Sequence, residues 1–61
     1  MKVTSEISIV EVNGEETTFP RPTLIVESHH QPQYFVTLRF EGQTITVNTA
    51  ELRVAISNAV R

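Results

Sequence analysis

The chain has 61 residues, no cysteine and a formal net charge of -2, with seven acidic residues against five lysine and arginine residues. Without cysteine, neither a disulfide framework nor a thiolate zinc site can stabilise the fold, and the acidic balance argues against nonspecific binding to nucleic acid. A chain this short buries only about 60% of its unfolded surface, so good packing or self-association has to supply the stability.

The N-terminal part of the chain predicts a β-hairpin. The stretch Val3 to Val12 is rich in β-branched residues and alternates polar with apolar positions, which favours a strand over a signal peptide or a membrane span. Asn13-Gly14 supplies the two positive-φ positions of a type I′ turn, and a short return strand is expected near Glu16 to Phe19.

Because the N-terminal stretch resembles neither a signal peptide nor a membrane span, we expect a cytoplasmic protein with no membrane segment. We expect it to fold as a single compact domain over residues 1–61.

The middle of the chain predicts three further strands. Pro20 and Pro22 each remove a backbone donor, so a regular ladder cannot run through them and the chain should kink there. The expected strands are Thr23 to Ser28, Tyr34 to Phe40 and Gln43 to Val47, the last two joined by a tight turn at Glu41-Gly42. Together with the hairpin they form a mostly antiparallel sheet.

The C-terminal segment predicts a helix. Asn48 can cap its first turn, and Glu51 stands where a capping box places its second residue. The apolar period changes to about 3.6, which puts five residues on one side: Leu52, Ala55, Ile56, Ala59 and Val60. The expected fold class is α+β, with a small antiparallel sheet of four or five strands and one C-terminal α-helix packed on one face.

The strand Tyr34 to Phe40 places apolar residues on both faces of the sheet. Tyr34, Val36, Leu38 and Phe40 form the expected core face, whereas Phe35, Thr37 and Arg39 lie on the other face. This apolar surface exceeds what one short helix covers. Two explanations stay open, a sheet that bends so that both sets reach one core, or an exposed patch that pairs with another chain.

The adjacent histidines His29 and His30 are interpreted as part of a turn. Neighbouring residues of an extended chain point to opposite faces, and zinc ligands in proteins are spaced by two or more residues. The sequence His-His-Gln-Pro-Gln, with Pro32 fixing its geometry, links two strands instead. We expect no metal and no cofactor here, although both imidazoles could sense pH or contact a partner.

No arrangement of residues indicates catalysis. The chain contains no aspartate, and its two glycines, Gly14 and Gly42, belong to hairpin turns rather than to a nucleophile elbow or a phosphate loop. We therefore expect no catalytic residue and no enzymatic activity.

The hypothesis that remains is a small noncatalytic protein-interaction module, acting as a homodimer or by binding or inhibiting a larger protein. The candidate contact residues are Phe35, Thr37, Arg39, His29 and His30. The alternative is single-stranded nucleic-acid binding, with Phe35 stacking on bases and Arg39 contacting phosphate, but such sheets surround their aromatic residues with positive charge and this chain is acidic.

Overall fold

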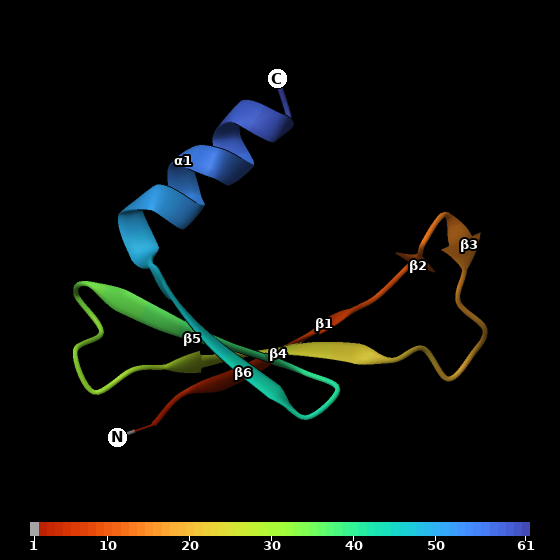
Figure 1. Ribbon diagram of the computed structural model, residues 1–61, viewed down its shortest axis with the longest axis horizontal. Coiled ribbons are helices and arrows are strands. Elements are labelled where there is room, and N and C mark those ends of the chain that lie inside the picture. Colours follow the sequence, from red (N-terminus) through yellow and green to blue (C-terminus); the bar gives the residue numbers. More distant parts are fainter. Residues whose placement is uncertain (1) are drawn as a thin grey trace.

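The computed structural model describes residues 2–61 as a four-stranded antiparallel sheet, a separate two-stranded hairpin and one C-terminal helix (Figure 1). The sheet has the strand order β1-β4-β5-β6. This confirms the α+β class with an antiparallel sheet. The elements are β1 (Thr4–Ser8), β2 (Glu11–Val12), β3 (Glu15–Glu16), β4 (Thr23–Ser28), β5 (Phe35–Phe40), β6 (Gln43–Asn48) and α1 (Thr49–Ala59).

Both predicted hairpin turns are present. Asn13 and Gly14 have φ angles of 53° and 82°, and Glu41 and Gly42 have φ angles of 50° and 78°. Two successive positive φ values are what a type I′ turn requires, and its twist matches the twist of the flanking strands. The second turn sets the register of β5 against β6, in which Phe40 faces Gln43.

The expected N-terminal strand is divided in two. Strand β1 pairs with β4 only as far as Ser8, and one more backbone bond joins Ile9 N–H to the carbonyl of Pro22 at 2.8 Å. Pro22 has no N–H to return that bond, so the ladder ends there. The chain then leaves the sheet, and β2 and β3 form a separate hairpin arm at one end of the molecule (Figure 1).

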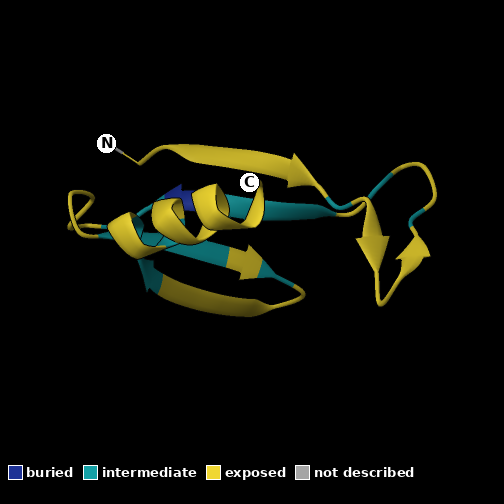
Figure 2. Ribbon diagram, turned by 90° about the horizontal axis from the view of Figure 1, so that it is seen from above, coloured by how far each residue is buried: buried dark blue, intermediate teal, exposed yellow. Residues whose placement is uncertain are grey.

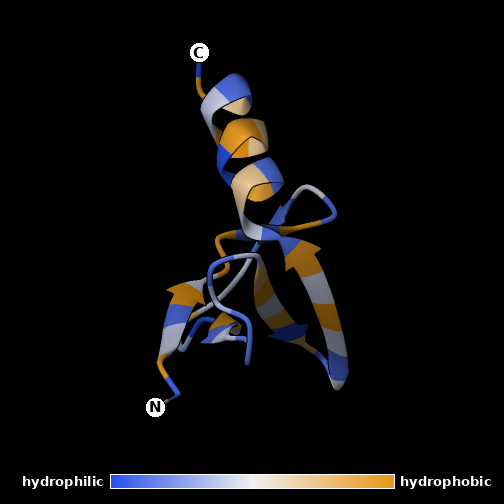
Figure 3. Ribbon diagram, turned by 90° about the vertical axis from the view of Figure 1, so that its left-hand side faces the viewer, coloured by the Kyte–Doolittle hydropathy of each residue, from blue (hydrophilic) through white to orange (hydrophobic). Residues whose placement is uncertain are grey.

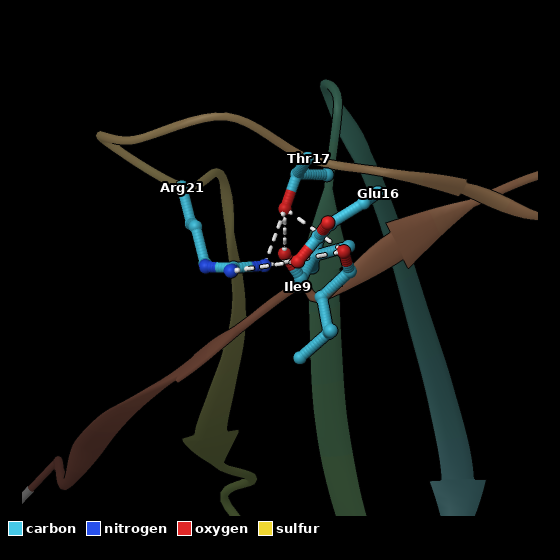
Figure 4. A network of polar contacts seen from close by, with 5 residues as sticks. Ile9, Glu16, Thr17 and Arg21 are labelled. Atoms are coloured by element: carbon cyan, nitrogen blue, oxygen red, sulfur yellow. Dashed lines mark hydrogen bonds and ion pairs between the residues drawn. The ribbon is translucent and has the colours of Figure 1, made fainter.

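Polar contacts hold the base of this arm (Figure 4). The Thr17 hydroxyl donates to the carbonyl of Ile9. Arg21 donates from Nη1 to the Val10 carbonyl at 3.2 Å and to Thr17 Oγ1 at 3.1 Å, and its Nη2 lies 3.5 Å from a Glu16 carboxylate oxygen. The guanidinium of Arg21 is thus used to fix the arm to the start of β4.

The helix begins as predicted but does not pack flat on the sheet. Asn48 Oδ1 accepts a hydrogen bond from Glu51 N–H at 2.9 Å, which confirms the N-cap. No residue of α1 is buried, and Leu52 is the one apolar residue of the helix that is half-buried. The helix extends away from the sheet (Figures 1 and 3). Asn48 is both the last residue of β6 and the helix cap. Because no loop separates the two elements, the chain has no room to turn back over the sheet.

The described part of the chain, residues 2–61, has no buried hydrophobic residue, and only Glu27 is buried, at 8% exposure (Figure 2). The accessible surface of the chain is 5209 Å². A compact monomer of 6.9 kDa exposes about 4,000 Å², so this chain exposes roughly 1,200 Å² more. The radius of gyration, 12.9 Å, likewise exceeds the value of about 10.5 Å for a compact domain of this length.

Removing the helix cap should destabilise α1. We expect Asn48→Ala to lower helix stability by about 1 kcal/mol, because the Glu51 N–H loses its acceptor. The helical circular-dichroism signal measures this effect. Asn58→Ala is the matched control on the exposed side of the same helix, where alanine should raise the helical signal slightly. Equal losses in both variants would contradict a capping role.

Candidate interaction surface

One face of the sheet is apolar and uncovered. The register of the strands places Val26 opposite Leu38 and Leu38 opposite Ile45, so their side chains lie on the same side of the sheet. Hydrophobic positions recur along the strands at every second residue (Figure 3). We call this side the apolar face; its hydrophobic residues are Ile7, Leu24, Val26, Val36, Leu38, Phe40, Ile45 and Val47.

The apolar face is hollowed toward the β6 edge. A groove of about 210 Å³ is lined by Leu24, Leu38, Phe40, Gln43 and Ile45. Ile45 is 53% exposed, and Leu38 and Phe40 are only half-buried. Helix α1 contacts β6 beside its own starting point and leaves this groove open. The surface that a core would normally bury is therefore accessible to another molecule.

The opposite face, which we call the polar face, is organised around Glu27. Its carboxylate oxygens lie 2.8 Å from Arg39 Nη2 and 3.6 Å from Lys2 Nζ. A carboxylate is stable in such a site only when it is paired, and here both oxygens have cationic partners. The same face carries threonines from each of the four strands: Thr4, Thr23, Thr37, Thr44 and Thr46.

The structure places Phe35, Thr37 and Arg39 together on the polar face, as their spacing predicts. The Phe35 ring is half-buried and stands edge-on to His29, with ring centroids 5.4 Å apart. Arg39 is held by Glu27, so its charge is already partly balanced. The uncovered hydrophobic residues lie on the other side of the sheet from these three.

The histidine pair lies in the connection between β4 and β5, where the sequence predicts a turn. The rings of His29 and His30 are 4.0 Å apart, and His29 Nδ1 accepts a hydrogen bond from Gln31 N–H at 3.1 Å. His29 therefore stabilises the turn. Over residues 2–61 no group of three or more metal-ligating side chains converges.

Two exposed hydrophobic residues were not singled out by the sequence. Phe19 is 93% exposed and lies beyond the return strand, which ends at Glu16. Ile45 is 53% exposed because α1 does not cover it. The sequence contains one indication of this exposure: the strand residues are followed by helix residues at Asn48 with no loop between them, so the helix cannot fold back over Ile45.

Nucleic-acid binding by the polar face can be tested directly. We expect no retention of the protein on single-stranded oligonucleotides at low salt, because Glu27 competes with phosphate for Arg39. The measurement compares the natural chain with Arg39→Glu, and Arg53→Glu on the exposed helix serves as the charge-matched control. Retention that disappears only in Arg39→Glu would restore the nucleic-acid hypothesis.

Helix α1 has 11 residues, and no helix in the described part of the chain is long and apolar enough to cross a membrane. No protein-family model, no curated protein and no solved structure matches the sequence or the fold. The function has to be argued from the two faces of the sheet.

Proposed function

We propose that the chain is a noncatalytic protein-interaction module that self-associates as a homodimer at its four-stranded sheet. The observation that supports this most strongly is the uncovered apolar face in a chain whose described residues include no buried hydrophobic residue. Large exposed apolar patches on small proteins mark interaction surfaces, and a domain of this size usually needs additional stabilisation.

The amount of exposed surface agrees with an interface. The chain exposes roughly 1,200 Å² more than a compact monomer, and a standard interface buries about 800 Å² on each partner. Binding of a partner would thus reduce the accessible surface of the chain to the range of a compact monomer of this size.

The chemistry of the apolar face favours a second copy of the chain as the partner. Its polar positions are Ser5, Ser28 and Gln43, so no charged residue from the four strands lies on it. A second copy can contact such a face without removing any charge from water, and a two-fold dimer needs a patch that is complementary to itself. A larger protein with an apolar surface is the other partner that this chemistry admits.

The noncatalytic part of the proposal rests on how the ionisable groups are used. Glu27 is paired with Arg39 and Lys2, Arg21 fixes the hairpin arm, and His29 stabilises a turn. A hollow of about 410 Å³ lies along α1, and Glu51 is the single ionisable side chain that lines it. Catalysis needs several polar groups aimed into one cavity.

The mass in solution tests this proposal. Light scattering across a hundredfold dilution should give a mass near twice 6.9 kDa at high concentration, falling toward 6.9 kDa on dilution. A mass of 6.9 kDa at every concentration would contradict self-association. In that case the apolar face would be left for a different protein.

A further inference from the structure

The two edge strands of the sheet differ in how well they are protected. Strand β1 carries Glu6 at its centre, whereas β6, with the sequence QTITVN, has no charged residue and no proline. Proteins commonly place charge or proline on edge strands to prevent pairing with other chains. By this criterion β1 is protected and β6 is open to pairing.

The backbone of β6 presents its free groups in a defined pattern. Ile45 faces Leu38 and Val47 faces Val36, and the next rung is the bond from Thr49 N–H to the Tyr34 carbonyl at 2.9 Å. Hydrogen-bonded and non-bonded pairs alternate in an antiparallel ladder. The residues bonded to β5 are therefore the odd-numbered ones. Thr44 and Thr46 direct their N–H and C=O groups away from the sheet.

We propose, on the basis of the self-association proposed above, that β6 pairs antiparallel with β6 of a second copy about a two-fold axis at Ile45. In this register the outward groups of Thr44 bond to Thr46 of the second copy, and the reverse pair follows by symmetry. The four outward groups of Thr44 and Thr46 in each strand are matched without any contribution from the turn or the helix. The product is a continuous eight-stranded sheet.

This register also joins the two apolar faces. Ile45 lies opposite Ile45 of the second copy as a non-hydrogen-bonded pair. The row Val26, Leu38, Ile45 therefore continues across the two-fold axis into Ile45, Leu38 and Val26 of the second copy. Asn48, the helix cap, comes to lie opposite Gly42 of the second copy. Each α1 then starts beside the other copy's hairpin turn.

Introduced cysteines test the register, because the chain contains none of its own. Ile45→Cys should form a disulfide-linked dimer under mild oxidation, since opposed Cα atoms about 4.5 Å apart are within disulfide range. Ile7→Cys is the matched control: Ile7 is also 53% exposed on the apolar face, but lies on β1. It should yield little linked dimer.

The outcomes separate this inference from the proposal it rests on. Equal cross-linking of both variants, or none for Ile45→Cys while light scattering still shows a dimer, would overturn the β6 register and leave a dimer of stacked faces. A monomer by light scattering would overturn both.

A second variant tests the backbone pairing. Thr46→Pro removes an outward N–H but no bond to β5, and proline is tolerated on edge strands in that position. It should raise the dimer dissociation constant roughly tenfold or more, because two intermolecular hydrogen bonds are lost by symmetry. Thr4→Pro makes the same change on the outward side of β1 and should leave the constant unchanged. Equal effects would contradict pairing through β6.

Discussion

Replacing Leu38 with alanine should weaken self-association by roughly 30-fold or more, equivalent to about 2 kcal/mol. Leu38 lies at the centre of the apolar face, between Val26 on β4 and Ile45 on β6, and lines the groove beside β6. Truncating it removes the apolar neighbour of Ile45, the residue on the proposed two-fold axis, and leaves a cavity beside the contact. The dilution midpoint in light scattering measures the change.

The control for this prediction is an alanine substitution at Thr37, the residue before Leu38. Thr37→Ala changes a side chain of similar exposure on the same strand, but on the polar face. Its dilution midpoint should stay within about threefold of the natural chain, as expected for a site away from the contact. If both variants shift equally, or if Leu38→Ala has no effect, the apolar face is not the surface that associates.

Replacing Glu27 with glutamine should lower the free energy of unfolding by about 2 kcal/mol, because the ion pairs of a buried carboxylate with Arg39 and Lys2 are lost. Glu27 is the one buried residue among residues 2–61, and its carboxylate lies 2.8 Å from Arg39 Nη2. Glutamine preserves the shape but removes the charge that both cations pair with. Urea unfolding at neutral pH measures the difference.

An exposed glutamate on the same face provides the comparison for Glu27. Glu6→Gln in β1 removes the same charge from a position open to water, where it should change stability by at most about 0.5 kcal/mol. Similar losses in the two variants would mean that net charge, rather than the buried pair, accounts for the effect.

The elements with strong local signals could be predicted from the sequence. Strand β4 matches its expected range, β5 and β6 differ from theirs by one residue each, and both type I′ turns and the Asn48 cap are present. Each of these depends on residues close together in the chain. β-branched runs, Asn-Gly and a capping residue act over one or two turns of backbone.

The placement of the helix and the hairpin arm could not be predicted in the same way. The apolar stripe of α1 is typical of a helix that covers a sheet, but the missing loop after Asn48 directs it away. The division between β1 and β2 depends on Pro22, which lies opposite Ile9 only once the sheet has formed. Both effects depend on tertiary geometry rather than on local propensity.

The candidate site was predicted in part. The shared face of Phe35, Thr37 and Arg39 follows from strand alternation and is present in the structure. The pairing of Arg39 with Glu27 could not be predicted, because it needs the register of β4 against β5. The uncovered apolar face follows from the helix position and was therefore also beyond the sequence.

The most direct test of the link between folding and association is the concentration dependence of the melting temperature. For a chain that folds as a dimer, a hundredfold increase in concentration adds about 2.7 kcal/mol by mass action. With the unfolding entropy of two 61-residue chains, this predicts a rise of roughly 10 °C in melting temperature. Melting curves that superimpose across the hundredfold range would show that the chain folds alone and would contradict the proposal.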